Sequence, residues 1–451
     1  MIPRLSPFRE QTLHDLAAMI SNDPKDVKTF YYKQVLDHFN YRPESYNTFD
    51  QRYLINFKYW GGANYSAPIL VYLGGESSID RYPNGIGFLS ENAATVKALL
   101  VYIEHRYYGK SVPFKSREEA FKNASTLGYF NSAQALADYA EVLIDIKKTL
   151  QAQNSPIVVI GGSYGGSSNI LTWPLVLWLY LLQYSILMIL HHQMLSWMLF
   201  QGILKKSVRH AMKQYCILGL KLTNPLNQSF ELSDYLENMY TAAAQDNHPP
   251  EYPVTVICNG IDEASFGNNI LDKIYSGVVA RNGNGTCKIN SPTNKSETLE
   301  GWEWQTCSEM VMPFGIGNDT MFQPYTFNLK RFVEKCQKDY DVLPRPHWIT
   351  TYYGGHNIKL VLQKFGSNII FSNGLKDPYS SSGVLNNLSD NIVAIQTING
   401  SHCLDILPSK QSDPGWLIEQ RKKEVEIIQG WIAQYYIDLG ALYGEPKLQN
   451  N

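Results

Sequence analysis

The sequence predicts an α/β protein with a doubly wound core. Three short apolar runs, at residues 68–73, 98–104 and 156–160, are typical of buried strands. An amphipathic helix is predicted between the second and third runs, over residues 131–150. The third run leads into Gly161-Gly162-Ser163-Tyr164-Gly165, which places a serine at the carboxyl end of a strand. Strands that alternate with helices, together with such a turn, indicate helices on both faces of a sheet.

Length and charge limit the classes of protein to consider. The 451 residues allow one large domain with an insertion, or two domains. A formal net charge of −2 and a pI near 6.6 argue against nucleic-acid binding and against a polybasic membrane surface. The 30 Tyr, 18 Phe and 9 Trp suit a well-packed globular enzyme rather than a disordered chain.

The N-terminal part predicts strands. Residues 1–27 have the character of an exposed lead-in, and the alternating aromatic runs of residues 29–60 predict antiparallel edge strands. The buried strand at 68–73 then runs into Gly74 and Gly75. A glycine turn after this strand supplies an oxyanion N–H in hydrolase folds, so both glycines are candidates. A plain strand-ending turn is the alternative.

The strand at residues 98–104 ends in the polar cluster 105–111, which either lines a cleft or forms a buried structural network. We expect His105 to be structural rather than catalytic. In the helix that follows, Asn131 or Ser132 can provide the N-cap. One apolar stripe is predicted on this helix, formed by Leu136, Tyr139, Leu143, Ile146 and Leu150.

Ser163 has the setting of a nucleophile. Flanking glycines permit the cramped strand-to-helix turn that exposes the serine oxygen. The backbone N–H of Tyr164 would then point at a developing oxyanion. An ordinary tight glycine turn is the alternative interpretation of this pentapeptide.

A candidate acid and base follow two further predicted strands. Asp377 comes after the strand at residues 368–374, and His402 comes after the strand at 393–395. Alone, Asp377 would be a turn residue before proline and His402 a loop residue. With Ser163 they give the order Ser, Asp, His, each on a loop after its own strand, which completes a catalytic triad. A last amphipathic helix is predicted from Asp413-Pro414 to about residue 436.

Several longer motifs resemble the lysosomal Pro-X carboxypeptidase and dipeptidyl peptidase II family of serine peptidases, and most closely its plant Pro-X carboxypeptidase-like members. The motifs are YYKQVLDHFN (31–40), IEHRYYGKS (103–111), GYFNSA (128–133) and GGSYGG (161–166). The resemblance implies an α/β-hydrolase core with an inserted, mainly helical cap. It also implies cleavage of peptides next to proline in acidic compartments, without a metal or other cofactor. The family often has Trp where this chain has Tyr379.

The resemblance divides the chain into segments. It implies a core in two halves, residues 28–166 and 346–440, with a helical cap over residues 216–345. We expect Ser163, Asp377 and His402 to be the catalytic residues, with oxyanion donors at Tyr164 and Gly74. It allows a homodimer, and it leaves carboxypeptidase and dipeptidyl-peptidase action open.

Residues 167–215 do not fit this pattern. Residues 170–190 carry no charge and are nearly long enough to cross a bilayer, but a membrane span there would remove the helix that supports Ser163. We back-translated residues 169–174 with permissive codons and read the result in the frame that begins at the third base of each codon. This frame can encode Y-P-H-M-A, which resembles the family's sequence at this position. We therefore hypothesise out-of-frame translation over about 167–215. The lost helix and central strand would contribute more stabilisation than the whole free energy of unfolding of a typical domain. A chain without them is therefore expected to be inactive.

Cysteines and sequons bear on the compartment. The six cysteines include no C-x-x-C pair, which argues against a zinc site. The wide spacing permits disulfides. The alternative reading frame hypothesised for residues 167–215 encodes a cysteine that Cys258, Cys287, Cys307 or Cys336 could need as a disulfide partner. Residues 1–7 lack the apolar core of a signal peptide, so either the protein is cytosolic or its true start lies upstream, and we favour the upstream start. Eight N-x-S/T sequons favour a glycoprotein of the secretory pathway, located in the vacuole or lysosome or outside the cell. The sequons are at Asn64, Asn123, Asn227, Asn284, Asn294, Asn318, Asn387 and Asn399.

The predicted function is a serine exopeptidase that acts on peptides with proline near the scissile bond. His402 takes the Ser163 proton, Asp377 orients the imidazole, and water hydrolyses the acyl-enzyme. Three alternatives stay open at this point: a non-catalytic or unfolded product of a faulty gene model, a membrane-anchored hydrolase that uses residues 170–190, and another α/β hydrolase such as an esterase.

Overall fold

The computed structural model describes residues 26–166, 229–263, 270–283, 296–313, 315, 317, 324 and 326–443. The predicted lead-in up to residue 25 and the atypical segment 167–215 lie outside these residues, so the predictions about them are not tested. The same holds for four of the sequons, those at Asn227, Asn284, Asn294 and Asn318.

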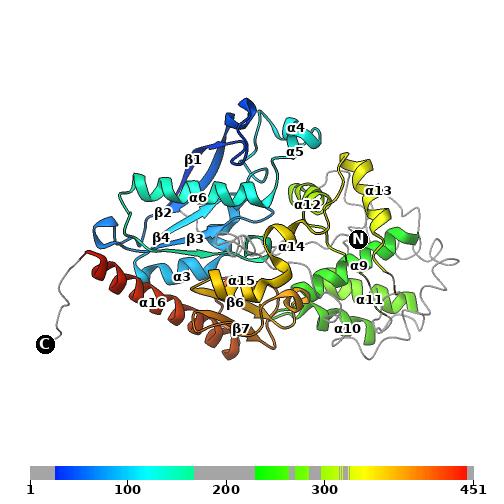
Figure 1. Ribbon diagram of the computed structural model, residues 1–451. Coiled ribbons are helices and arrows are strands. Elements are labelled where there is room, and N and C mark those ends of the chain that lie inside the picture. Colours follow the sequence, from blue (N-terminus) through cyan, green and yellow to red (C-terminus); the bar gives the residue numbers. More distant parts are fainter. Residues whose placement is uncertain are drawn as a thin grey trace.

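A five-stranded mixed sheet lies at the centre of the molecule (Figure 1). Its strands are β1 (Val27–Val35), β2 (Thr48–Asn56), β3 (Ile69–Leu73), β4 (Leu99–Ile103) and β5 (Ile157–Ile160), in the spatial order β1-β2-β4-β3-β5. β1 and β2 pair antiparallel, as predicted, but of these two only β1 lies at an edge of the sheet that the described residues form. β2 also pairs antiparallel with β4, while β3 runs parallel to both β4 and β5.

Two further strands form a separate parallel pair. They are β6 (Ile369–Gly374) and β7 (Ile392–Thr397), which confirm the two strands predicted before Asp377 and His402. Among the described residues, β5 and β6 each have one hydrogen-bonded neighbour, so the described strands form two sheets and not one continuous sheet.

Helices cover both faces of the central sheet, as the doubly wound pattern predicts (Figure 1). On one face lies α6 (Ser132–Thr149), which begins where the Asn131 side chain accepts a hydrogen bond from the Gln134 N–H (3.0 Å). On the other face lie α3 (Gly87–Val96) and α16 (Gly415–Tyr443). Successive strand side chains point to opposite faces, and each face therefore has its own apolar core.

The two cores follow this alternation. Ile69, Val71 and Leu73 pack with the predicted stripe of α6, while Leu70 and Tyr72 pack with α3 and α16. The strands β3 and β4 are buried along their whole length, which explains why their sequences are continuously apolar rather than alternating.

A second group of helices lies at one end of the molecule, on the right of Figure 1. Leu236, Ile257 and Ile261 belong to a small core of its own that the first helices of this group share. The group consists of α9 (Ser229–Gln245), α10 (Pro253–Asp262), α11 (Ile270–Asn282), α12 (Glu297–Ser308) and α13 (Leu329–Tyr340).

Shorter helices connect these parts. The α-helices are α2 (Tyr82–Gly85), α4 (Arg117–Ala120), α5 (Ala124–Leu127), α14 (Trp348–Tyr352) and α15 (Ile358–Phe365). The 3-10 helices are η1 (Pro43–Tyr46), η2 (Ala63–Tyr65), η3 (Ile79–Arg81), η4 (Gly355–Asn357), η5 (Pro378–Ser382) and η6 (Leu404–Ile406).

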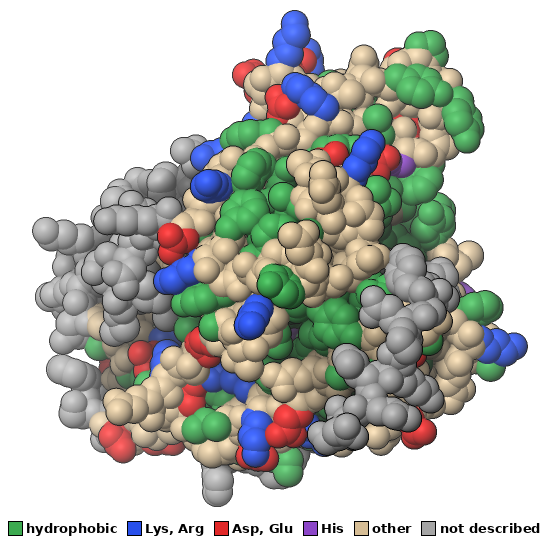
Figure 2. Space-filling view, turned by 90° about the vertical axis from the view of Figure 1, so that its left-hand side faces the viewer, with side chains coloured by type: hydrophobic (Ala, Val, Ile, Leu, Met, Phe, Trp, Pro, Cys, Tyr) green, Lys and Arg blue, Asp and Glu red, His purple; other side chains and the backbone are tan. Residues whose placement is uncertain are grey.

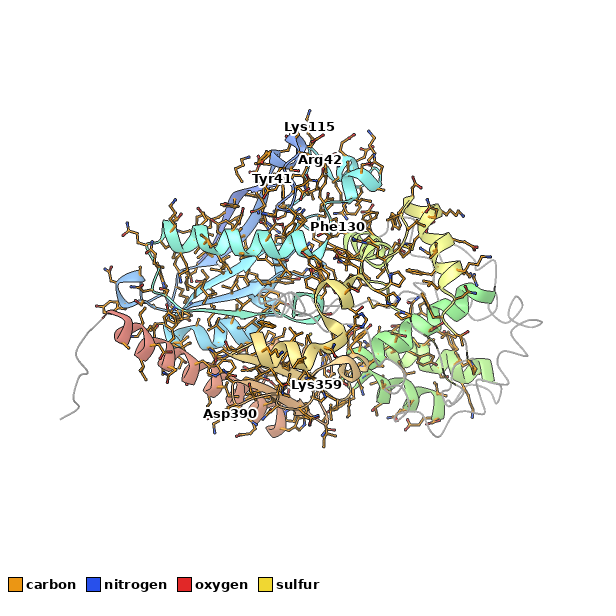
Figure 3. The ribbon with its side chains drawn as sticks, viewed as in Figure 1. Tyr41, Arg42, Lys115, Phe130, Lys359 and Asp390 are labelled. Carbon is orange, nitrogen blue, oxygen red and sulfur yellow. A yellow bond between two sulfur atoms is a disulfide. The ribbon has the colours of Figure 1, made fainter. Side chains whose placement is uncertain are left out.

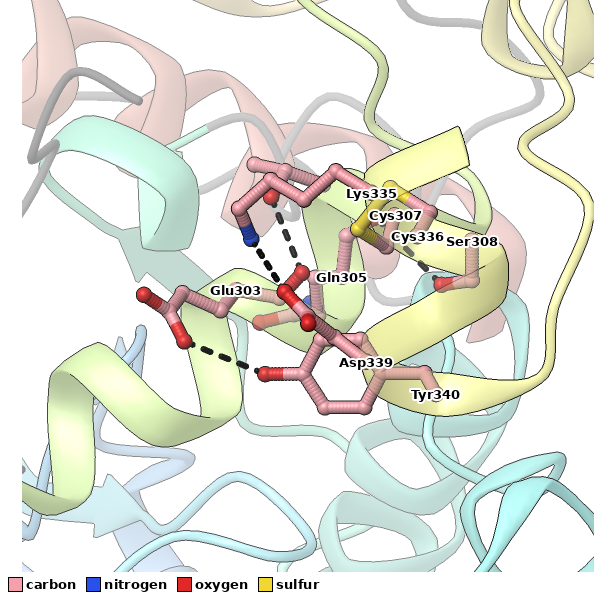
Figure 4. Close-up of a disulfide and its surroundings, with 9 residues drawn as sticks. Glu303, Gln305, Cys307, Ser308, Lys335, Cys336, Asp339 and Tyr340 are labelled. Carbon is pink, nitrogen blue, oxygen red and sulfur yellow. Dashed lines mark hydrogen bonds and ion pairs between the residues drawn. A yellow bond between two sulfur atoms is a disulfide. The ribbon is translucent and has the colours of Figure 1, made fainter. Parts of the chain in front are cut away.

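A disulfide joins α12 to α13 (Figure 4). It links Cys307 to Cys336, so neither of these cysteines needs a partner from the alternative reading frame, which corrects that part of the prediction. The same two helices are also joined by the Tyr340 hydroxyl, which donates to Glu303 Oε2 (3.2 Å). Cys258 and Cys403 carry free thiols.

α12 is also attached to the sheet half through the motif that precedes α6. Trp304 Nε1 donates to the backbone oxygen of Phe130 (3.0 Å), which lies in the interior and is labelled in Figure 3. Just after α12, Glu309 accepts hydrogen bonds from the Ser132 N–H (2.7 Å) and hydroxyl (3.1 Å) at the start of α6. The GYFNSA motif thus serves as a docking point for α12.

The surface fits the balanced charge of the sequence. On the face in Figure 2, basic and acidic side chains are interspersed around hydrophobic ones. In the described part of the chain, no helix is both long enough and apolar enough to span a membrane.

Candidate active site

Ser163 lies at the turn where β5 passes into a short helical segment, residues 163–166. Its backbone φ of +57° is left-handed, which is uncommon for a residue other than glycine and costs conformational energy. Two glycines of this turn are closely packed, Gly162 against side chains and Gly165 against backbone. A Cβ on Gly162 would lie 2.7 Å from Ile406, and a Cβ on Gly165 would lie 2.7 Å from the Leu73 oxygen.

The glycine turn after β3 packs against the Ser163 turn. A Cβ on Gly75 would lie 3.3 Å from the Gly165 backbone nitrogen. The Gly74 N–H, however, donates to the Ile103 oxygen (2.8 Å) and extends the β3–β4 pairing by one residue. Gly74 was a predicted oxyanion donor, and its N–H is already occupied in this structure.

Asp377 and His402 are in direct contact, although 24 residues separate them in the chain. His402 Nδ1 donates to Asp377 Oδ2 at 2.6 Å, and Asp377 Oδ1 accepts from the Tyr379 N–H (2.9 Å). β6 and β7 are parallel, so the loops that follow them meet at one edge of the pair. These loops are hydrogen-bonded to each other, because the Lys376 N–H donates to the Gly400 oxygen (2.9 Å).

Both side chains are nearly buried, with 9% of Asp377 and 7% of His402 exposed. Burial disfavours the charged imidazole, but the charge of Asp377 and its hydrogen bond, together with Cys403, raise the pKa of His402 well above its ordinary value. Because Nδ1 is held by Asp377, Nε2 is the nitrogen left to act. It is buried and has no hydrogen-bond partner among the described residues.

The His402 loop also touches the Ser163 turn. A Cβ on Gly162 would lie 3.0 Å from Cys403 Sγ, so the residue before the predicted nucleophile packs on the residue after the predicted base. The three predicted residues therefore sit on loops in mutual contact. The Tyr379 ring packs on the His402 ring at a centroid distance of 5.4 Å.

Tyr164 is fully buried, and its hydroxyl lies 3.0 Å from His105 Nε2. His105 Nδ1 lies 2.6 Å from the Arg106 oxygen, and burial lowers the pKa of His105 to about 4, which keeps the ring neutral. His105 therefore supports the turn from behind, which agrees with the structural role predicted for it.

The polar cluster after β4 is a buried network and not a cleft lining. Arg106 makes two hydrogen bonds to Asp138 on α6, both 2.6 Å long, and Arg52 of β2 pairs with Glu104. All four side chains are 2% exposed or less. Buried charges need such complete pairing, so this part of the IEHRYYGKS motif holds β2, β4 and α6 together.

One buried acidic residue near this site was not identified from the sequence. Glu76 follows Gly75 directly and is 0% exposed. Burial raises its pKa to about 7, while its own backbone N–H and the charge of His402 oppose the increase. The only signal in the sequence was an acidic residue directly after a buried strand and a glycine turn.

Comparison with known proteins places the chain in a family. A family model described as Serine carboxypeptidase S28 matches residues 34–173 and 227–424. Lysosomal Pro-X carboxypeptidase of Homo sapiens is 33% identical over 470 aligned positions, which cover 92% of this chain and 90% of that protein. Two further relatives are prolyl carboxy peptidase like protein 5 of Caenorhabditis elegans (26% identical, 90% of each chain) and thymus-specific serine protease of Homo sapiens (23%, 90% of this chain and 87% of that protein).

The matched residues include both parts of the site. Ser163 lies in the first matched range, and Asp377 and His402 lie in the second, while residues 174–226 fall between the two. Together, the family match and the identity to these relatives confirm the resemblance that the motifs indicated. The chain belongs to the S28 family of serine carboxypeptidases and is a serine-type peptidase.

Proposed function

We propose that this peptidase is Pro-X carboxypeptidase-like and cleaves peptides next to proline, with Ser163 as nucleophile, His402 as base and Asp377 as the acid that orients the base. The observation that carries the proposal is the 2.6 Å hydrogen bond between Asp377 and His402, on a loop that packs against the Ser163 turn. Preference for proline is supported by the name of the Homo sapiens relative.

The proposed reaction begins when His402 Nε2 accepts the Ser163 hydroxyl proton and the serine oxygen attacks the substrate carbonyl. Asp377 keeps the remaining imidazole proton on Nδ1 and stabilises the imidazolium. His402 then protonates the leaving amine, and an acyl-enzyme forms. Water attacks this ester with His402 again as base, which releases the acid product and restores Ser163.

The Tyr164 N–H is the proposed first oxyanion donor. For the second we favour Gly75 over Gly74, because the Gly74 N–H is held by Ile103. The Gly75 N–H interacts with a side chain, the Tyr82 hydroxyl, whereas the Gly74 N–H belongs to the backbone pairing between β3 and β4. That hydroxyl also pairs with Ser77 Oγ (2.7 Å), so Tyr82 keeps a partner when a substrate oxygen takes the Gly75 N–H.

We further propose an α/β-hydrolase core built from residues 28–166 and 346–440, with residues 216–345 as a helical cap. Support comes from the helices on both faces of the sheet and from the separate apolar core of α9 to α11. An acidic lysosomal or vacuolar location is supported by the lysosomal relatives and by four exposed sequon asparagines, at Asn64, Asn123, Asn387 and Asn399.

The proposal is tested by hydrolysis of Pro-X peptides that have a free carboxyl end, with matched ester and X-Pro amide substrates beside them. Release of the C-terminal residue of the peptide is expected from a chain in which residues 167–215 are restored to the continuous reading frame, and Ser163→Ala in that chain should lower the rate about 10⁴-fold or more. Ser409→Ala, at an exposed serine, is the matched control and should change nothing. Retained turnover in Ser163→Ala would reject the assignment.

The second candidate is a non-catalytic product, and one observation favours it. Residues 174–226 lie between the two ranges that the family model matches, in agreement with out-of-frame translation over about 167–215. Sequencing the transcript across codons 160–220 separates the two. A continuous frame encoding Y-P-H-M-A after the Ser163 helix supports the active peptidase. A transcript that encodes the sequence as printed, with no fluorophosphonate labelling of Ser163, supports the non-catalytic product.

A further inference from the structure

One arginine of the last helix holds the base loop, which we define as residues 402–407. Arg421 of α16 donates to three backbone carbonyls of this loop. Its Nε donates to the Asp405 oxygen (2.7 Å), and its Nη2 donates to the oxygens of Leu404 (3.0 Å) and Leu407 (3.0 Å). A guanidinium carries its N–H donors in a fixed plane, so one side chain holds all three carbonyls in a single arrangement at the end of η6.

The Arg421 side chain is itself fixed. Its Nη1 donates to Asp413 Oδ2 (2.6 Å), and the same carboxyl oxygen accepts from the Lys410 N–H (2.8 Å). Only 11% of the Arg421 side chain and 8% of the Asp413 side chain are exposed. A guanidinium is not deprotonated in proteins, so its hydrogen bonds to the loop carbonyls persist at acidic as well as neutral pH.

The base loop packs against the residue that precedes Ser163. Cys403, directly after His402, has a left-handed φ of +52°, which is uncommon for a residue other than glycine. A Cβ on Gly162 would lie 3.0 Å from Cys403 Sγ and 2.7 Å from Ile406 Cδ1. The position of this loop therefore bears both on the imidazole that it carries and on the turn that presents the serine.

The residue before Arg421 holds the two strands that lead to the acid and to the base. Gln420 Nε2 donates to Ser372 Oγ of β6 (2.8 Å). Thr397, the last residue of β7, donates through its hydroxyl to Gln420 Oε1. This part of α16 is thus a common frame for β6, β7 and the base loop, and Arg421 is the member of the frame that contacts the loop.

We propose that Arg421 is a positioning residue of the active site, which sets the place of the His402 imidazole relative to Ser163 by holding the base loop. The assignment rests on the proposed function, because it presupposes that His402 is the base. Proton transfer requires the imidazole nitrogen within hydrogen-bond reach of the serine hydroxyl, and a misplacement of about 1 Å costs about 10²-fold in rate. Asp377 fixes the tautomer of the ring, while Arg421 fixes the chain that follows it.

The test is the kinetics of Arg421→Met in the chain with residues 167–215 restored to the continuous reading frame. Met keeps much of the length of the side chain and removes all four hydrogen bonds. The final extent of fluorophosphonate labelling at Ser163 counts the assembled sites, and kcat is expressed per labelled site. We expect this kcat to fall about 10²-fold, because the base is displaced in every folded molecule. KM for a Pro-X peptide should change little, since Arg421 is not proposed to touch substrate.

Arg421→Lys keeps the charge but replaces the planar fork by a point charge, so kcat per site should fall by an intermediate factor of about ten. The acid limb of the kcat/KM profile should stay in place in both variants. The reason is that Arg421 bonds to backbone carbonyls and to Asp413 rather than to the imidazole. A displaced limb would assign Arg421 an electrostatic effect on His402 and overturn the positioning role.

The matched control is Tyr436→Phe, further along α16. The Tyr436 hydroxyl donates to the Ser66 oxygen (2.8 Å), which fastens the helix to the segment before β3 and not to a catalytic loop. This substitution should leave kcat per site unchanged, whatever it does to stability. If Arg421→Met reduces the number of labelled sites but leaves full kcat at those that remain, Arg421 is purely structural. That result overturns the proposal and leaves the proposed function intact.

Two other outcomes are also decisive. If Arg421→Met gives no labelled sites, Arg421→Gln is a second neutral variant, and the absence of labelled sites in both would assign Arg421 a purely structural role. If the restored chain with Arg421 in place neither hydrolyses Pro-X peptides nor reacts with a fluorophosphonate, the proposed function fails, and this assignment fails with it.

Discussion

Asp377 and His402 come together because two residue-scale features coincide. Asp377 caps η5 through one oxygen, which fixes its side chain and turns the other oxygen to His402 Nδ1. Proline at position 378 pre-sets the turn. A carboxylate held in this way fixes the imidazole tautomer, so the Asp377–His402 pair is the most sensitive point of the proposed mechanism.

Asp377→Asn should lower kcat about 10⁴-fold, because the amide can donate to Nδ1 and hold the wrong tautomer. The KM for a Pro-X peptide should change little, since Asp377 is not proposed to touch substrate. Steady-state kinetics at the pH optimum measure both values. Asp390→Asn is the control, because Asp390 is exposed (Figure 3). A loss of less than tenfold in Asp377→Asn would contradict the role given to Asp377.

At the scale of elements, the site depends on backbone contacts that leave no room for side chains. The turn after β3 and the turn after β5 meet at Gly75 and Gly165, and the loops after β6 and β7 meet at Gly374 and Gly400. Within each of the two sheets, parallel neighbouring strands bring the turns that follow them to one edge, and glycine lets these turns touch. Element packing, rather than any single side chain, therefore sets the position of Ser163.

Gly165→Ala should displace the Ser163 turn, because its Cβ would lie 2.7 Å from the Leu73 oxygen. The free energy of unfolding should fall by about 1–3 kcal/mol, as in other overpacked sites. Fluorophosphonate labelling of Ser163 should fall at least tenfold. Urea unfolding and labelling rates provide the two measurements.

Gly430→Ala on α16 is the matched control for this substitution. Nothing lies within 4 Å of its Cβ position, so the change should be neutral or stabilise the helix by up to about 1 kcal/mol. Equal effects of the two substitutions would show that the contact with β3 is unimportant.

At the scale of the whole molecule, several buried carboxyl groups favour a mildly acidic environment. Burial raises the pKa of Glu76 and of Glu309 to about 7. Burial and the nearby Asp405 raise the pKa of Glu424 to about 8. A group whose pKa is raised on folding binds its proton more tightly in the folded chain. The cost of such a group to folding stability is therefore absent below 4.5, the ordinary pKa of a glutamate. The cost grows as the pH rises towards the folded pKa of 7 or 8.

His105 acts in the opposite direction over this pH range. Burial lowers the pKa of His105 from 6.5 to about 4, so its neutral ring costs stability as the pH falls below 6.5. Each pH unit between the unfolded and folded pKa is worth about 1.4 kcal/mol per group. Buried carboxyl groups with raised pKa values outnumber His105, so the greatest stability should lie on the acidic side of neutrality.

The melting temperature should accordingly be higher at pH 5 than at pH 7.5. Calorimetry or fluorescence-monitored melting at constant ionic strength measures the difference. The double variant Glu309→Gln, Glu424→Gln should show a smaller difference, since two of these carboxyl groups can no longer titrate. A melting temperature that rises steadily from pH 5 to pH 7.5 would contradict the raised pKa values.

The sequence by itself determined the features that depend on neighbours along the chain. Strand periodicity, the Asn131 cap, the α6 stripe and the glycine pattern around Ser163 are all set within a few residues, and the structure confirms β1 to β7 and α6 on that basis. The order Ser163, Asp377, His402 was likewise visible as three local turn patterns, and it became a candidate site only because strand ends converge.

Only the tertiary structure decided which distant groups meet. It paired Cys307 with Cys336, tied the Gly74 N–H to Ile103, made the cluster after β4 a buried network, and buried Glu76 completely. The physical reason is that burial and charge coupling depend on separation in space, and the groups that meet are far apart in the chain. A local pattern can mark a residue as able to act, while its partners and its pKa follow from packing.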